Sequence, residues 1–407
     1  MFDKIKKVIK SLGPGIIIAS VVLGPGSIAV ASRIGSEVGY SFLWVIIPAS
    51  LSMIIYVSMA VRFGITNSQS ILHAIAQTYG RWFSVLIGVS AFISAACFQF
   101  GNNLGIGIGM EGITGIDERV WPVVFTFSAI ILLFWAKNLY KALEKLMMIL
   151  VMIMILAFFI NILVVKPDVE QVAKGFLPIS LNAKNLNIVA ALIATTFALN
   201  GAIYQSYLVQ DKGWKISNLN RALNDSYMGI FFLALISILI IITSAAALYP
   251  IGVTVNSAAD MALQLEALFG NYAMIVFSFG LCAAAFSSLM VNAVIGGGLL
   301  SDGLGLGRSM NERIPKILTT IILVLGMLIA VFFQGNVIYA LIVAQATTLV
   351  VVPLIAVGMY LILNNKQIMG NFRNSTWQNI LAMLSFILIS IIIYYLYSNF
   401  ISFLSTT

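Results

Sequence analysis

The stretch Leu23-Gly24-Pro25-Gly26-Ser27 interrupts an apolar run that extends from about residue 13 to residue 32. Without the interruption, this run is long enough to cross a bilayer as one helix. Proline removes a backbone donor and clashes with the preceding turn, and the flanking glycines add conformational freedom. Inside a membrane, freed backbone groups are tolerated where protein satisfies them or where they line a water-filled cavity. The stretch therefore predicts a broken helix at the substrate site of a transporter, although a kink that serves only packing would leave the same pattern.

The composition identifies the class of protein. The chain has 407 residues, of which 61% are hydrophobic and only 9% are charged. Long, repeated apolar runs of this kind are typical of a polytopic helical membrane protein. The single histidine, His73, and two isolated cysteines, Cys97 and Cys282, exclude an ordinary zinc site and a histidine-based catalytic triad. We therefore expect a protein that is not an enzyme and that needs no cofactor.

The charged residues predict how the chain crosses the bilayer. Five basic residues fall on one set of loops: Arg33, Arg119, Lys166, Lys174 and Lys184. The other 17 of the 22 lysines and arginines fall on the opposite set, which places the N-terminus in the cytoplasm and the C-terminus outside the cell membrane. This distribution accounts for the basic composition without a nucleic-acid partner. Eleven spans are expected, at about 13–33, 40–62, 81–111, 119–136, 145–165, 187–211, 226–249, 268–301, 315–333, 336–362 and 376–404.

A second interruption, Ala198-Leu199-Asn200-Gly201, lies in the sixth span. Interrupted helices at corresponding places in two halves are the sequence pattern of an inverted-repeat transporter with its site between them. The pattern predicts one transporter domain over 1–407, with repeats at about 13–165 and 187–362 and an added helix at about 376–404. We expect a monomer. Gly101, Gly105 and Gly109 recur every four residues in the third span and predict a smooth face for a neighbouring helix.

The chain resembles the natural-resistance-associated macrophage protein (Nramp) family of divalent metal transporters along almost its whole length. The matching motifs are Gly13-Pro14-Gly15, Gly39-Tyr40-Ser41-Phe42-Leu43-Trp44, Leu143-Glu144-Lys145, Gly175-Phe176-Leu177-Pro178, Leu208-Val209-Gln210, Gly280-Leu281, Ser287-Ser288, Gln345 and Pro353. The resemblance implies an all-α integral membrane protein with the LeuT-type fold of two inverted five-helix units, here with an eleventh transmembrane helix. It also implies a secondary transporter that works by alternating access.

The sequence departs from this family at the metal site. The family motif Asp-Pro-Gly-Asn corresponds to Gly24-Pro25-Gly26-Ser27, so the ligating aspartate is absent. The family motif Met-Pro-His corresponds to Ala198-Leu199-Asn200, which lacks the thioether that favours soft metals. A second family histidine corresponds to Gln205, and two acidic positions associated with proton movement correspond to Gln99 and Asn102.

Among ligand-type side chains of the family, only Gln345 is retained. The candidate substrate-binding residues are Gly24, Ser27, Val21, Thr195, Ala198, Asn200, Gln345, Gln99 and Asn102, with Ser27, Asn200 and Gln345 as candidate metal ligands. Val21 and Thr195 would act through their backbone carbonyl oxygens.

These departures change the expected cargo. All 14 acidic residues fall in loops or at span ends, so we expect no proton coupling by the family's route. Amide and carbonyl oxygens offer ligands without counter-charge, which favours a hydrated hard cation such as magnesium over manganese or iron. Two alternatives stay open, namely a small neutral or zwitterionic organic solute and a homologue that no longer transports. The polar residues also have structural readings: Asn200 as a cap of broken backbone, Gln345, Gln99 and Asn102 as interhelical contacts, and Tyr204 and Tyr207 as packing or gating residues.

Overall fold

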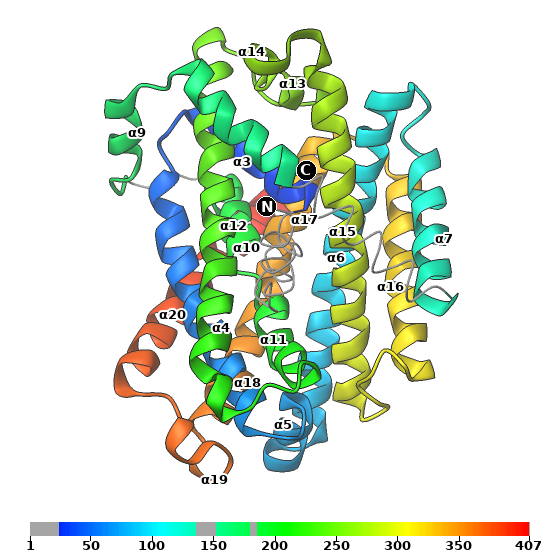
Figure 1. Cartoon of the computed structure of the whole chain (residues 1–407), viewed down its shortest axis with the longest axis vertical. Helices are drawn as coiled ribbons and strands as arrows, with labels where there is room; N and C mark the ends of the chain where they lie inside the picture. The colour runs from blue at the N-terminus through cyan, green and yellow to red at the C-terminus, as the bar shows by residue number, and fades with distance from the viewer. Residues whose placement is uncertain (1–23, 136–151, 180–184, 407) are drawn as a thin grey trace, which may run out of the picture.

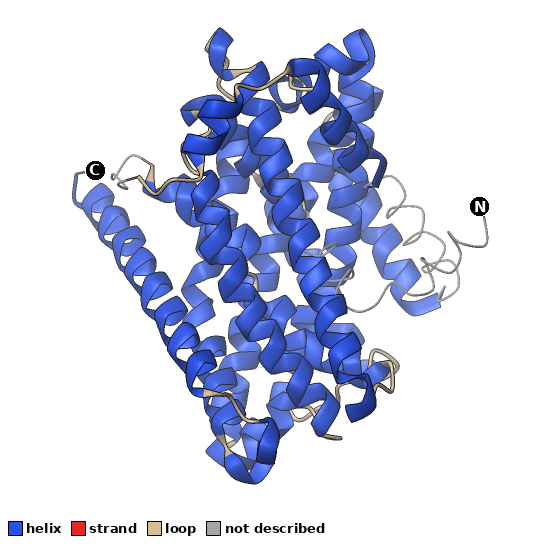
Figure 2. Cartoon of the chain, turned by 60° about the vertical axis from the view of Figure 1, so that its left-hand side comes forward, coloured by secondary structure: helices blue, strands red, loops and turns tan. Residues whose placement is uncertain are grey.

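The computed structural model describes residues 24–135, 152–179 and 185–406. Throughout these ranges the regular structure is helical (Figures 1 and 2). Eight of the described helical segments are long and apolar enough to cross a membrane. Each of the eleven predicted spans contains at least one described helix, while Val21 and the other residues before Gly24 lie outside the described residues.

The described helices, with the labels of Figure 1, are α3 Pro25–Val38, α4 Ile46–Thr66, α5 Ile71–Tyr79, α6 Arg81–Thr114, α7 Val120–Trp135, α9 Val169–Gly175, α10 Leu186–Thr196, α11 Leu199–Asp211, α12 Leu219–Ala247, α13 Ala258–Leu263, α14 Glu266–Phe269, α15 Ala273–Leu304, α16 Arg313–Phe332, α17 Val337–Thr347, α18 Val352–Asn364, α19 Lys366–Met369 and α20 Thr376–Thr406. A further helix covers Met152–Val165. The last helix, α20, lies along the outside of the bundle in Figure 2, and only 22% of its most apolar window is buried.

The predicted break in the sixth span is present. Helix α10 ends at Thr196, and α11 begins at Leu199. Between them, Phe197 and Ala198 have ψ angles of 68° and 87°, which are not helical. Helix α3 likewise begins at Pro25, with Gly24 extended before it at φ −101° and ψ 177°. Proline suits this first helical position because the backbone donor that it lacks would have no helical partner there.

A third interruption was not predicted. The span expected at 336–362 divides into α17 and α18, which are joined by a 3-10 turn at Thr348–Val351. Pro353 lies in the first turn of α18, where its missing N–H costs no helical hydrogen bond. The turn places Gln345 in the last turn of α17.

The glycine face of α6 fits the helices around it, as predicted. A Cβ atom at Gly105 would overlap the ring of Pro25, and one at Gly109 would lie 3.3 Å from the backbone nitrogen of Cys282. A Cβ at Gly101 would lie 3.4 Å from the end of the Leu341 side chain. The small residues therefore let α6 approach α3, α15 and α17 closely.

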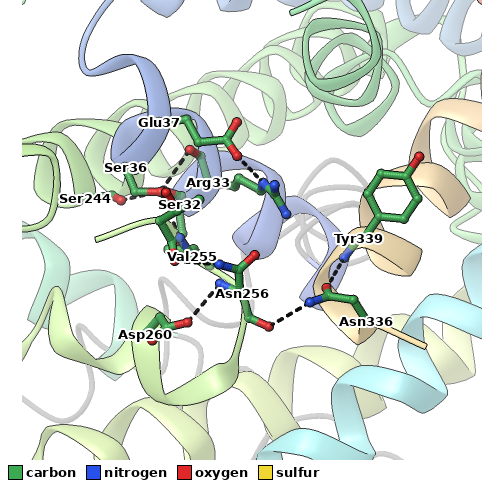
Figure 3. Close-up of polar contacts among 11 residues, drawn as sticks. Ser32, Arg33, Ser36, Glu37, Ser244, Val255, Asn256, Asp260, Asn336 and Tyr339 are labelled. Atoms are coloured by element: carbon green, nitrogen blue, oxygen red, sulfur yellow. Dashed lines mark hydrogen bonds and ion pairs between the residues drawn. The ribbon is translucent and has the colours of Figure 1, made fainter. Parts of the chain in front are cut away.

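Polar contacts hold the far end of α3 (Figure 3). The hydroxyl of Ser244 on α12 donates to the carbonyl oxygen of Ser32. The backbone N–H of Val255 donates to the hydroxyl of Ser36 over 3.2 Å. Because both contacts come from outside α3, they fix the helix that begins at Pro25.

The segment after α12 forms two short helices. Ser257 caps α13, since its hydroxyl accepts the N–H of Asp260 over 3.1 Å. Helix α13 ends at Leu263, and α14 begins at Glu266.

Candidate functional site

The beginning of α3 faces two other helices. A Cβ atom at Gly24 would lie 2.9 Å from the hydroxyl oxygen of Ser288 on α15 and 3.1 Å from the side-chain oxygen of Asn102 on α6. These two groups therefore occupy the direction in which a longer side chain at position 24 would extend. The buried Ser27 hydroxyl donates to the Gly24 carbonyl oxygen over 2.7 Å, so it turns back onto its own helix.

Gln99 and Asn102 form a linked pair on α6. The Gln99 amide donates to the backbone carbonyl of Leu289 on α15, and the Asn102 amide donates to the Gln99 side-chain oxygen over 3.1 Å. Gln99 thus makes the interhelical contact that was one of its two expected roles. Its contact also orients Asn102, whose own oxygen points toward Gly24.

Gln345 supplies a buried acceptor without a partner. A Cβ atom at Gly26 would overlap the Gln345 amide nitrogen, so the amide lies directly against the first turn of α3. Gln345 is only 4% exposed. Its side-chain oxygen is fully buried and has no hydrogen-bond partner within the described ranges. An acceptor left in this state costs free energy unless a ligand or water satisfies it.

The break between α10 and α11 leaves buried backbone groups without helical partners. No backbone N–H of the described residues donates to the Thr195 carbonyl oxygen. The Thr195 hydroxyl donates to the carbonyl oxygen of Leu192 over 2.8 Å. Ala198 begins α11 without a side-chain cap. The free Thr195 carbonyl could therefore contribute a ligand, as carbonyl ligation does not depend on the side chain.

Asn200 does not cap the broken backbone. Its amide nitrogen instead lies 3.4 Å from the carbonyl oxygen of Ala91 on α6. Ala91 precedes Asn102 by eleven residues, which corresponds to about 16 Å along a helix. The structure therefore gathers Gly24, Ser27, Asn102 and Gln345 at one level and places Asn200 at another. Gln205 faces α12, where its amide donates to the Ser226 hydroxyl over 2.8 Å.

Tyr207 on α11 and Asp302 on α15 form a buried contact that was not among the candidates for a site. The Tyr207 hydroxyl donates to the carboxylate of Asp302 over 2.6 Å, and both side chains are buried. From the sequence, every acid is expected in a loop or at a span end. Asp302 is indeed in the last turn of α15, but it is only 6% exposed. The helix continues to Leu304, and Gly305 ends it in the left-handed conformation, a signal that could have extended the predicted span.

Comparison with known proteins identifies the family. Residues 15–399 match the natural resistance-associated macrophage protein-like (Nramp) family. The chain belongs to this family. Among Nramp relatives, the divalent metal cation transporter MntH of Staphylococcus saprophyticus is 23% identical over 416 residues, which cover 96% of this chain and 92% of the relative. MntH of Staphylococcus haemolyticus is 23% identical over 414 residues, with the same coverage of both chains.

Solved structures establish the fold. The manganese transporter of Eremococcus coleocola superposes with a TM-score of 0.76 at 18% identity, over 95% of this chain and 86% of that one. MhsT, solved in complex with L-phenylalanine, superposes with a TM-score of 0.64 at 16% identity, over 94% of this chain and 98% of that one. The LeuT-type fold that the family resemblance implies is confirmed. The relatives are transporters, which confirms a multi-pass membrane transport protein in place of an enzyme.

Proposed function

We propose that this Nramp-family protein carries a divalent metal cation across the membrane by alternating access. The names of its relatives and the broken helices α10 and α11 support transport of this class. The residue that carries the proposal is Gln345, whose amide nitrogen lies against the first turn of α3 and whose buried side-chain oxygen has no hydrogen-bond partner among the described residues. An acceptor in this position can bind a cation or one of its waters.

The chemistry of the group favours a hydrated hard cation. Ser27, Asn102 and Gln345 offer hydroxyl and amide oxygens, and no three His, Cys, Asp or Glu residues gather anywhere in the described part of the chain. Oxygen ligands suit magnesium, which gives up its waters reluctantly and is usually bound with several of them. This site offers manganese or iron neither the carboxylate nor the thioether of the family motifs. We therefore propose magnesium as the preferred cation. Ser27 and Gln345 would bond its waters beside Gly24, and Asn200 would bond them when the cation lies at the level of Asn200.

Uptake into liposomes tests the proposal. Wild-type protein is expected to take up magnesium faster than manganese, because the site offers only oxygen ligands and lacks the thioether that favours a softer metal. Gln345→Ala is expected to reduce magnesium uptake at least about tenfold, corresponding to the loss of about 1.4 kcal/mol of binding, and Asn200→Ala is expected to reduce it as well. Gln367→Ala is the matched control, since Gln367 is exposed on α19. Equal uptake by Gln345→Ala and Gln367→Ala would remove Gln345 from the site.

We also propose that transport does not depend on a proton gradient. The groups nearest to a Cβ atom at Gly24 belong to the neutral Ser288 and Asn102, and the family's two proton-associated positions carry the neutral Gln99 and Asn102. Magnesium uptake should therefore be the same with and without an imposed pH gradient at constant membrane potential. A pH-sensitive dye inside the liposomes provides the second measurement. Acidification of the liposome interior that tracks magnesium entry would refute the proposal.

A neutral site also suits a small neutral or zwitterionic organic solute, and the structural neighbour MhsT was solved with an amino acid. Calorimetry separates the candidates. Absence of binding by any divalent cation at millimolar concentration would leave the organic solute or a non-transporting homologue, and solute flux would then divide these two.

The arrangement in the cell is part of the proposal. We place a monomer in the cell membrane, with the N-terminus in the cytoplasm and the C-terminus outside. The two repeats span about 13–165 and 187–362, and the added helix about 376–404. Labelling of single cysteines from each side of intact cells measures this orientation.

A further inference from the structure

We propose that Asp302 forms a second, inner cation site on the transport path and that Tyr207 gates it. The inference deepens the proposed function and rests on it, because the ligand would be the same class of divalent cation. It concerns a different level of the molecule from the group around Gly24.

The first observation is an isolated buried charge. Asp302 is the only acidic residue that is buried among the residues that the structure describes. It forms no salt bridge there, and its carboxylate accepts one hydrogen bond, from Tyr207 over 2.6 Å. The nearby Arg81 guanidinium donates to the backbone carbonyl oxygens of Asp302 and Gly303 over 3.4 and 3.3 Å, not to the carboxylate. A buried carboxylate is costly without a cation or further donors, so this group is suited to receive one.

The second observation is that one face of α11 and one face of α15 lead from the central residues toward Asp302. On α11, Asn200, Tyr204 and Tyr207 are spaced by four and three residues, which puts them on one face. On α15, Ser288 and Asp302 are 14 residues apart, close to four full turns, so they also share a face about 21 Å long. Ser288 lies against Gly24 at one end of this face, and Asp302 meets Tyr207 at the other.

The third observation is a pair of aromatic rings between the levels. Tyr204 and Tyr207 stack with their ring centroids 5.4 Å apart and their planes 13° apart. A Cβ atom at Gly298 of α15 would lie 3.8 Å from the Tyr204 ring, so this ring lies against α15. A cation that passes between α11 and α15 from Asn200 to Asp302 would therefore displace these rings, and the Tyr207 hydroxyl would release the carboxylate.

The chemistry fits a divalent cation. The side chains around Gly24 offer uncharged oxygen ligands, whereas Asp302 supplies a full negative charge. Carboxylate and hydroxyl oxygens are ligands that hard cations accept, and a partly hydrated ion needs only one or two of them. The inner site would thus draw the cation out of the neutral level once the tyrosines move.

Magnesium titration by calorimetry on the purified full-length protein tests the inference. Asp302→Asn keeps an oxygen that can accept from Tyr207 but removes the charge. We expect this variant to bind magnesium at least about tenfold more weakly, with a Tm no lower than that of the wild type, because the buried charge is removed. Glu37→Gln is the matched control, because it removes a carboxylate at the outer end of α3 and should leave the affinity as it is.

A second variant separates cation binding from a structural bond between α11 and α15. Tyr207→Phe breaks the hydrogen bond and keeps the carboxylate, so its loss of affinity should be smaller than that of Asp302→Asn. Equal losses in the two variants would show that the bond acts as a structural latch and would overturn the inner site.

The outcomes also separate the two proposals. Wild-type affinity in Asp302→Asn with a loss in Gln345→Ala would overturn the inner site and leave the proposed function standing. A loss in Asp302→Asn with wild-type affinity in Gln345→Ala and Asn200→Ala would support the inner site and overturn the central one. No magnesium binding by the wild type would overturn both.

Discussion

Gly24→Asp combined with Ser288→Ala is expected to bind manganese at least about a hundredfold more tightly than the wild-type protein. Two unit charges about 4 Å apart in a partly screened site interact by about 4 kcal/mol, and a divalent ion doubles this energy. A hundredfold gain in manganese affinity is therefore a conservative expectation. The second substitution is needed for space. A Cβ at position 24 would lie 2.9 Å from the Ser288 hydroxyl oxygen, closer than such atoms normally approach. Asn292 keeps a partner in this variant, because its amide also donates to the Ser288 backbone carbonyl over 3.1 Å.

Calorimetric titration with manganese and magnesium measures this gain. The matched control is Gly24→Asn with Ser288→Ala, which adds nearly the same volume without the charge and should leave manganese affinity near that of the wild type. Gly24→Asp alone should gain less than the double variant, because Ser288 must first move aside. Equal manganese affinities in the aspartate and asparagine double variants would show that position 24 does not face the bound cation.

The features that the sequence predicted correctly depend on local chemistry. Pro25 cannot continue a helix from the residues before it, and Gly24 provides no side chain to cap one, so the start of α3 follows from these residues alone. The glycine spacing of α6 likewise predicts close packing whichever helix supplies the neighbour. The comparison with a known motif then indicated which side chains were absent.

The features that the sequence missed depend on which helices meet. Asn200 was expected beside Gly24, yet its amide reaches Ala91, because the contact is set by how α11 packs on α6. The burial of Asp302 depends in the same way on Tyr207 from a distant segment. The 3-10 turn at Thr348–Val351 had a local signal in Pro353, but proline at that spacing is also compatible with a continuous, kinked helix.

Gly26→Ala is expected to reduce magnesium uptake at least about tenfold, as much as Gln345→Ala does. The added methyl group would overlap the Gln345 amide nitrogen and lie 2.8 Å from the carbon that bears it, so the whole amide must leave its position. Uptake into liposomes measures the effect, and Tm reports the cost of the added volume, which is about 1–3 kcal/mol for an overpacked interior. Gly101→Ala is the control, because its methyl group would meet only the flexible end of Leu341 at 3.4 Å.

The double variant Gly26→Ala with Gln345→Ala distinguishes loss of the site from loss of the fold. Removing the amide relieves the overlap, so the Tm should return toward that of the wild type. Uptake should stay low, because the side-chain oxygen of Gln345 is gone. Recovery of uptake together with Tm would mean that Gly26 serves only the packing of α3 and that Gln345 does not bind the cation.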